Sequence, residues 1–462
     1  MARTSREATA ASPDVRPISY PELGLCFSRA AVLIPRLAPG EHESVTYASA
    51  ALARTQRPSS LELRTPPKSA ATALQRIGLS SLREVQTRKT TAHPEGAYAR
   101  LESLGVTLAF FGGDSVYSNA INELAGEFEF IPDFPMWLPP RASLGTVPTM
   151  QGLSAPFKTE WPDSCGVSLA WERSIRGSNV LIGVLDTGID ADHPEFSGKL
   201  VTYRYVSFFP NSPYWPPRDV RGFDMGGHGT HVCGIIAGKN VGIAPEVSLY
   251  VASVIESETT RTTFIRVTYG LNWLLQQFSR PENQDKPAVI NMSLGIETSP
   301  PPEMDHGEFE LRIKGLQLLM RTLAEANVLT VAAVGNDGPG KIGYPGAFEE
   351  VVGVGAVDFE RKIASFSGSA QPGKLAKPDL VGYGVDVYSS VERDYSGHAI
   401  YKRFSGTSMA APYVTGIASL YWCQDSNMSV RAIQQRLLDN CETLSGQPKD
   451  RIGKGLARFK LS

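Results

Sequence analysis

The sequence predicts an α/β protein with a doubly wound, mostly parallel sheet and helices on both faces. Several apolar runs are continuous rather than alternating, which is typical of strands buried on both faces. Segments with helical spacing lie between these runs, and this β-α-β alternation is typical of a parallel sheet. The chain has 462 residues, 42% of them hydrophobic, which suffices for a large core.

The predicted strands and helices of this sheet lie in the second part of the chain. The strands are expected at 179–186, 247–255, 288–295, 328–336 and 351–357. The helices between them are expected at 263–278 and 309–327. We assign these elements to one domain over residues 165–462, with its chemistry at the carboxyl ends of the strands.

The first third of the chain has a different organisation. Residues 1–25 are rich in Ala, Ser, Arg and Pro, which predicts a disordered tail. Residues 94–134 predict a small helix-strand-helix-strand unit, of which AYARLESLG is the first helix. We assign residues 26–138 to an N-terminal region of α/β type, and the residues 139–164, dense in Pro, Gly and Ser, to a linker.

Charge and cysteine content exclude several classes of protein. The net charge of −2 gives no electrostatic case for nucleic acid or an anionic membrane as partner. No apolar run approaches the roughly 18–20 residues that a membrane helix needs. The five cysteines have no CxxC spacing, which argues against a disulfide framework and a zinc ribbon. We expect a cytoplasmic protein, because the first residues lack a secretory signal; secretion by an unrecognised route is the alternative.

Four polar residues stand at strand ends or helix starts of the predicted domain. Asp186 ends the first strand in LDTGID, and His228 follows two glycines in GGHGTHVCG. Ser408 begins a helix in FSGTSMAAP, and Asn336 follows a strand in AAVGNDG. Taken singly, Asp186, His228 and Ser408 have structural alternatives: a turn-capping aspartate, a buried polar histidine and an N-cap serine. Together they supply an acid, a base, a nucleophile and an oxyanion donor at one sheet edge.

The blocks VLDTGID, HGTHVCG and GTSMAAP, in this order, resemble those of the subtilases, the subtilisin-like serine proteases, over about residues 165–462. The resemblance implies that Asp186 orients His228, that His228 takes the proton of Ser408, and that Ser408 attacks the scissile carbonyl. The backbone N–H of Ser408 and the side chain of Asn336 would hold the oxyanion. The resemblance also implies a polypeptide substrate, bound beside Ser293, Leu294, Gly295, Gly335 and Asp337.

Two features of this implied site stay open on the residues alone. Asp337 either favours a basic residue on the acyl side of the cut or is a solvated loop aspartate. The N-terminal region resembles a subtilase prodomain by position only, so it is an intramolecular inhibitor, a substrate-recruiting domain or a structural extension. If it is a prodomain, we expect a cut within 132–165.

No cofactor is expected, although many secreted subtilases bind calcium in a loop after the helix of the catalytic histidine. Here HVCGIIAGKNVGIAPEVSLY leaves little room for that loop, while other calcium sites stay open. His231 and Cys233 follow His228 closely, but no further His and Cys set supports a metal site. We interpret His231 as a structural neighbour and Cys233 as a core residue.

The predicted function is therefore a serine endopeptidase that works through an acyl-enzyme and is regulated by its N-terminal region. One alternative is a specialised maturation protease or transpeptidase, because an acyl-enzyme does not specify its acceptor. Another is a binding module with a permanently plugged protease fold. A missing triad residue would favour the binding module, and none is missing.

Overall fold

The computed structural model describes residues 29–36, 74–81, 96–139, 161–206, 220–296, 304–371 and 376–461. The predicted tail at 1–25 and most of the predicted linker lie outside these residues.

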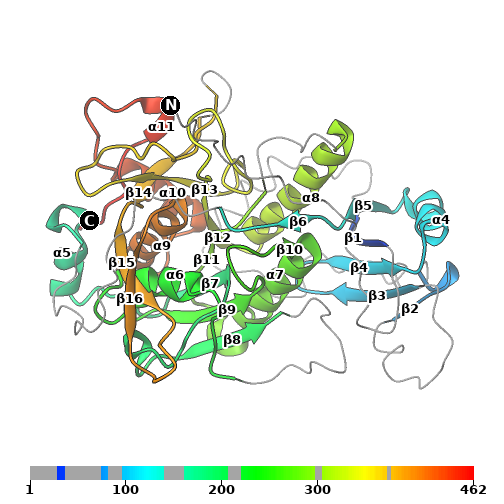
Figure 1. Ribbon diagram of the computed structural model, residues 1–462, viewed down its shortest axis with the longest axis horizontal. Coiled ribbons are helices and arrows are strands. Elements are labelled where there is room, and N and C mark those ends of the chain that lie inside the picture. The colour runs from blue at the N-terminus through cyan, green and yellow to red at the C-terminus, as the bar shows by residue number, and fades with distance from the viewer. Residues whose placement is uncertain are drawn as a thin grey trace, which may run out of the picture.

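A seven-stranded parallel sheet forms the centre of the larger unit (Figure 1). Its strands follow the order β14-β13-β12-β11-β7-β9-β8, and every neighbouring pair is parallel. The five predicted strands are confirmed as β7, β9, β11, β12 and β13, whereas β8 and β14 were not predicted. The strands of the sheet are β7 Leu181–Asp186, β8 Val201–Tyr205, β9 Ser248–Ser253, β11 Ala288–Met292, β12 Val328–Ala333, β13 Val352–Val357 and β14 Leu380–Tyr383.

Both faces of this sheet are buried, which explains the continuous apolar runs. In β7, Ile182 and Val184 belong to one hydrophobic cluster, while Leu181 and Leu185 belong to another. Successive strand residues point to opposite faces, so a strand between two cores needs apolar residues at every position.

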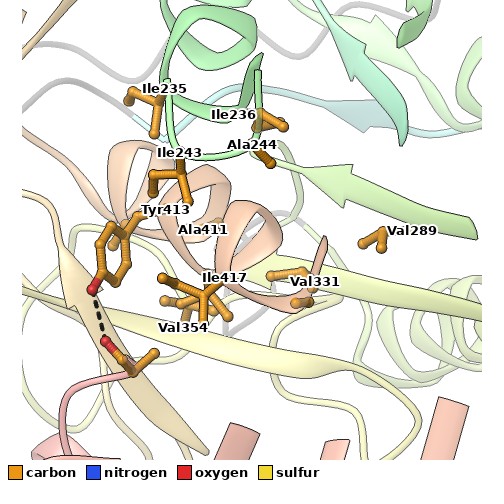
Figure 2. Packing of buried hydrophobic residues seen from close by; sticks show 14 of the residues in the cluster. Ile235, Ile236, Ile243, Ala244, Val289, Val331, Val354, Ala411, Tyr413 and Ile417 are labelled. Carbon is orange, nitrogen blue, oxygen red and sulfur yellow. Dashed lines mark hydrogen bonds between the residues drawn. The ribbon is translucent and has the colours of Figure 1, made fainter. Parts of the chain in front are cut away.

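Two pairs of helices cover the two faces. Helices α6 (His228–Ala237) and α9 (Thr407–Gln424) pack on one face, where Ile417 lies near the strand residue Val331 (Figure 2) and Ile236 belongs to the same hydrophobic cluster. Helices α7 (Phe264–Phe278) and α8 (His306–Glu325) pack on the other face. The helices predicted at 263–278 and 309–327 are thus confirmed.

Smaller elements complete this unit. Strands β15 and β16 form an antiparallel pair beside α6. Trp161, near the end of the predicted linker, is buried, and its indole N–H donates to the carbonyl of Val241 at 2.9 Å. No helix among the described residues is long and apolar enough to cross a membrane. The smaller elements are η2 Asp163–Cys165, α5 Val167–Glu172, η3 Pro194–Phe196, β10 Thr262–Thr263, η4 Pro281–Asn283, β15 Val387–Val391, β16 Ile400–Phe404, α10 Val430–Asp439 and α11 Lys449–Ile452.

The N-terminal residues form a second, five-stranded sheet in the order β2-β3-β4-β1-β5. This sheet is also sandwiched: Ala31 and Leu33 of β1 face helix α4, while Val32 belongs to the cluster that contains α7 and α8. Figure 1 shows the sheet beside α7 and α8. Its elements are β1 Arg29–Pro35, β2 Leu79–Ser81, β3 Gly96–Leu101, β4 Val106–Phe111, α4 Asp114–Leu124 and β5 Phe128–Pro132.

The helix predicted for AYARLESLG is wrong, because Gly96–Leu101 is strand β3 and a turn follows it. This strand pairs antiparallel with β4, from Gly96 opposite Phe111 to Leu101 opposite Val106. Alanine, leucine, arginine and glutamate favour helices by less than about 1 kcal/mol each, so pairing with an apolar neighbour strand overrides them. The other three elements predicted for this region, one helix and two strands, are confirmed as α4, β4 and β5.

The chain after β5 runs along the larger unit. The carboxylate of Asp133 accepts the backbone N–H of Ile265 at 2.9 Å, in the first turn of α7. The ring of Phe134 stacks on Phe264 with centroids 4.5 Å apart. Strand β6 (Pro135–Met136) then pairs antiparallel with β10. The N-terminal region is therefore joined to the larger unit by backbone pairing as well as by apolar packing.

Candidate active site

Asp186 and His228 meet at the carboxyl end of β7. Asp186 is the last residue of that strand and is fully buried. Its Oδ1 accepts a hydrogen bond from Nδ1 of His228 at 2.7 Å. Because a carboxylate only accepts, Nδ1 carries the proton, which leaves Nε2 of a neutral ring as the acceptor.

The backbone around His228 is fixed from two sides. Asp224 accepts four hydrogen bonds, from the backbone N–H of Gly226, Gly227 and Thr230 and from the hydroxyl of Thr230. His228 is the first residue of α6 and lies between these contacts. On the other side, the hydroxyl of Thr187 accepts the N–H of the residue after His228 at 2.8 Å. The imidazole is therefore held by its backbone as well as by Asp186.

Gly229 explains why glycine follows the histidine. An added Cβ there would lie 2.2 Å from the carbonyl oxygen of Gly188, in the turn after β7. Only glycine allows helix α6 to approach the strand end this closely. This approach brings His228 within reach of Asp186.

Ser408 lies in the first turn of α9 and is 2% exposed. The structural alternative, a helix-capping serine, is wrong, because Gly406 is the N-cap residue and no side chain caps this helix. The Ser408 hydroxyl instead donates to the carbonyl of Ser293 at 3.4 Å, and the Ser293 hydroxyl donates back to the carbonyl of Ser408 at 3.1 Å. In the first turn of a helix, a backbone N–H has no partner within the helix. The N–H of Ser408 is thus available to a developing anion.

Asn336 lies in the loop after β12 and faces the start of α9. Its Oδ1 accepts both the backbone N–H and the hydroxyl of Thr407, each at 2.9 Å. Since a backbone N–H must donate, this contact fixes the orientation of the amide. The Nδ2 group lies on the other side, 3.2 Å from where a Cβ of Gly406 would be. The amide donor of Asn336 therefore lies beside the turn that carries Ser408.

The other predicted substrate-binding residues divide into two groups. Gly295 exchanges two backbone hydrogen bonds with Trp137, at 2.9 and 3.1 Å, and Leu294 beside it is buried. Gly335 donates its N–H to the hydroxyl of Thr407 at 3.2 Å. Asp337 is exposed to solvent. The structure therefore brings residues 293–295 and Gly335 to the site and leaves Asp337 at its outer edge.

His231 is held by contacts with the surrounding protein. Its Nε2 donates to the carbonyls of Val387 and Lys402, each at 3.1 Å, and its ring stacks on Phe404. Cys233 is fully buried, and burial raises the pKa of its thiol well above the usual value. Neither is arranged for chemistry, and no group of three or more His, Cys, Asp and Glu side chains among the described residues could hold a metal ion.

The loop between α6 and β9, where we predicted no calcium loop, is held by a buried carboxylate. Glu195 is fully buried and accepts the backbone N–H groups of Asn240 and Val241 at 2.7 and 3.2 Å. It also accepts the side-chain amide of Asn240 at 3.0 Å and the hydroxyl of Tyr401 at 2.8 Å. Protein donors thus surround this carboxylate.

Sequence reasoning missed three residues that support the site, namely Thr187, Asp224 and Thr407. Thr187 and Thr407 stand directly beside Asp186 and Ser408 in the motifs, so their position was a usable signal. Asp224 is four residues before His228, where an acid near a helix start is a capping signal, but two glycines intervene and hide it.

Comparison with known proteins decides the family. The subtilase family model matches residues 177–455, which include Asp186, His228, Asn336 and Ser408. The chain belongs to the subtilase family.

Two relatives of this subtilase, PopC and subtilisin Savinase, agree with that assignment. It is 49% identical to the subtilisin-like protease PopC of Myxococcus xanthus over 398 residues, covering 86% of this chain and 81% of that one. It is 33% identical to subtilisin Savinase of Lederbergia lenta over 298 residues, covering 63% of this chain and 94% of that one. A solved structure, the prenylagaramide maturation protease PagA, matches 63% of this chain and 95% of its own, with 25% identity and a TM-score of 0.48. The protein is a subtilisin-like serine protease, and its seven-stranded unit has the predicted fold.

Proposed function

We propose that this subtilase hydrolyses internal peptide bonds through Asp186, His228 and Ser408. The observation that carries the proposal is the 2.7 Å hydrogen bond between Asp186 Oδ1 and His228 Nδ1, with both side chains buried. A carboxylate in that place keeps Nε2 unprotonated and stabilises the imidazolium that forms when Nε2 takes a proton. Nε2 is then the base that activates Ser408.

The reaction proceeds in two halves. The Ser408 oxygen attacks the scissile carbonyl carbon while Nε2 of His228 takes the hydroxyl proton, and the imidazolium then gives that proton to the departing amine. Water repeats the sequence on the acyl-enzyme and releases the carboxylic acid. The oxyanion of each tetrahedral intermediate receives hydrogen bonds from the backbone N–H of Ser408 and from Nδ2 of Asn336. In subtilisin itself, losing one such donor costs about 100- to 1,000-fold in rate.

The substrate lies as an extended strand between β10 and residues 293–295. Backbone pairing fixes its register and leaves side-chain selection to the pocket walls. Gly335 and Asp337 contribute to the wall beside the residue on the acyl side of the cut. The exposed carboxylate of Asp337 favours a basic residue there.

Labelling with a fluorophosphonate tests the catalytic assignment. The reagent phosphonylates an activated serine, whose oxygen displaces fluoride from phosphorus, so the chain freed of its N-terminal region should be labelled once, at Ser408. Ser408→Ala and His228→Ala should remove the label. Ser419→Ala, a buried serine in the same helix, is the matched control and should keep it. Absence of labelling in the wild-type chain, before and after removal of the N-terminal region, would overturn the proposal.

The N-terminal region, residues 26–138, acts as an intramolecular inhibitor. The support is the pairing of Trp137 with Gly295. Continuing this antiparallel register by two residues brings Pro139 opposite Ser293, whose carbonyl accepts the hydroxyl of Ser408. The end of the region thus runs along the strand proposed for substrate and toward the nucleophile. The cut that activates the enzyme lies within 132–165.

Intact mass spectrometry tests self-processing. The purified wild-type chain should lose its N-terminal region with time, while Ser408→Ala should stay at full length. An active wild-type preparation that keeps its full mass would contradict self-processing. The same measurement on peptide products separates hydrolysis from transfer to an amine, because a joined product is heavier than a hydrolysed one.

A further inference from the structure

A second carboxylate lies beside the proposed catalytic base. Oε1 of Glu258 is 3.9 Å from Nε2 of His228, the ring nitrogen that faces away from Asp186. The Glu258 side chain is 19% exposed. A carboxylate therefore lies beside the nitrogen that is proposed to take the proton, and part of its side chain is exposed to solvent.

The position of Glu258 is built into the fold. It is the second residue of a tight turn, in which Thr260 donates its N–H and its hydroxyl to the carbonyl of Ser257, at 3.2 and 2.8 Å. The same turn packs against the glycines before His228: a Cβ on Gly226 would be 3.0 Å from the Cα of Ser257. The turn and the start of α6 are thus in direct contact, which holds the carboxylate near the imidazole.

The N-terminal segment indicates which substrate residue would lie beside Glu258 and its turn. In the register proposed above, Pro139 lies opposite Ser293 and takes the place of the substrate residue just before the scissile bond. Leu138 then takes the place of the second substrate residue before that bond. Leu138 is 1% exposed and belongs to the same buried cluster as Val254 and Ile255, which lead into the Glu258 turn. Since neighbouring side chains in a strand alternate, this residue points away from the one at the cut.

We propose that Glu258 is a specificity-determining residue, which selects a lysine or arginine as the second substrate residue before the scissile bond. This inference rests on the proposed function. The aliphatic stem of such a residue takes the apolar place that Leu138 fills, and its charged head reaches the half-buried carboxylate. A charge-assisted hydrogen bond of this kind corresponds to about a 10-fold preference or more. The side chain of Leu138 is uncharged, so it cannot form an ion pair with the Glu258 carboxylate.

A matched peptide series tests the assignment. Three chromogenic peptides differ only in that second residue, which is Lys, Leu or Glu, and kcat/KM is measured for each. Ratios on one enzyme preparation are independent of its active fraction. For the wild type we expect the Lys peptide to exceed the Leu peptide by about 10-fold and the Glu peptide to be the poorest. High salt should reduce the preference, because the carboxylate is partly exposed.

Variants at Glu258 complete the test. In Glu258→Gln the preference for Lys should fall to within about three-fold, and in Glu258→Lys it should reverse in favour of Glu. Glu360→Gln removes an equal charge from an exposed surface site and should leave the preference unchanged. Equal rates for the three peptides in the wild type, or an unchanged preference in Glu258→Gln, would overturn the inference while leaving the protease assignment intact. No cleavage of any peptide would instead count against the proposed function.

Discussion

Substitution of Gly315 by alanine should release the N-terminal region from the protease. Gly315 lies in α8, where an added Cβ would be 2.5 Å from Cγ2 and 2.9 Å from Cγ1 of Ile131 in β5. Carbon atoms at these distances repel, so α8 and β5 must separate by about 1 Å to regain normal contact. Overpacking of this kind costs about 1–3 kcal/mol, which shifts the docking equilibrium by about 5- to 150-fold.

The same substitution should not lower the stability of the protease unit. Within a helix, alanine is favoured over glycine by about 1 kcal/mol, so α8 gains stability while the interface loses it. The assay is the initial rate of the full-length chain on a short peptide, with thermal unfolding followed in a Ser408→Ala background that prevents autolysis. We expect a higher initial rate for Gly315→Ala, up to the roughly 10-fold that freeing a cleft filled about 90% of the time allows, and no loss of thermal stability of the protease unit.

The matched control lies in the same helix. Gly307 is in the first turn of α8, where an added Cβ would meet only the end of the Asp305 side chain, at 3.0 Å. Gly307→Ala should leave the initial rate unchanged. A folded Gly315→Ala chain whose rate equals or falls below that of the wild type would refute the inhibitory role of this interface.

Three further predictions concern the site and its support. His228→Ala should abolish peptide turnover with the unfolding temperature unchanged, while His231→Ala, which removes two carbonyl contacts, should lower the unfolding temperature by several degrees. Burial raises the pKa of Asp190, but hydrogen bonds from Arg393 outweigh it and hold that pKa below its usual value. The Asp190 contact is therefore complete at neutral pH and is lost as pH falls through the lowered pKa of Asp190. Urea unfolding should show Asp190→Asn less stable by about 1–3 kcal/mol at pH 7, with a difference that shrinks as the pH is lowered below about 4. Glu195→Gln turns an amide N–H₂ toward buried donors, and urea unfolding should show it less stable than the wild type by about 1–3 kcal/mol.

The central sheet was predictable from the sequence because burial on both faces leaves a local signal. Strands β7 and β11 consist of residues that all lie in the core, so their apolar runs are uninterrupted. Strand β8 carries four half-buried residues among its five, because it is an edge strand, and its signal is correspondingly weak. The helix prediction for AYARLESLG was wrong because the deciding interaction is not local: its helix-forming residues become a strand only through pairing with β4.

The site was predictable as a set of residues but not as a geometry. Asp186, His228, Asn336 and Ser408 each follow a strand or begin a helix, so the motif and the α/β pattern together place them at one edge. The residues that fix their orientation belong to the tertiary structure. Glu258 is 30 residues from His228 in the chain, and nothing in SETTR indicates that its turn packs against Gly226.

The residues from Asp133 to Trp137 contact the larger unit without interruption, and this continuity bears on the proposed inhibition. Asp133 and Phe134 hold the start of α7, β6 pairs with the strand that leads into α7, and Trp137 pairs with Gly295. In the proposed inhibition, docking of the folded region and occupation of the cleft are therefore steps of one binding event. A short tether gives the tail an effective concentration on the order of millimolar, so a tail that alone binds with a Kd of about 0.1 mM would fill the cleft about 90% of the time. An inhibitory tail would thus not need the cationic residue that Glu258 is proposed to select in a substrate, and Leu138 would suffice as long as the sheet stays docked on α7 and α8.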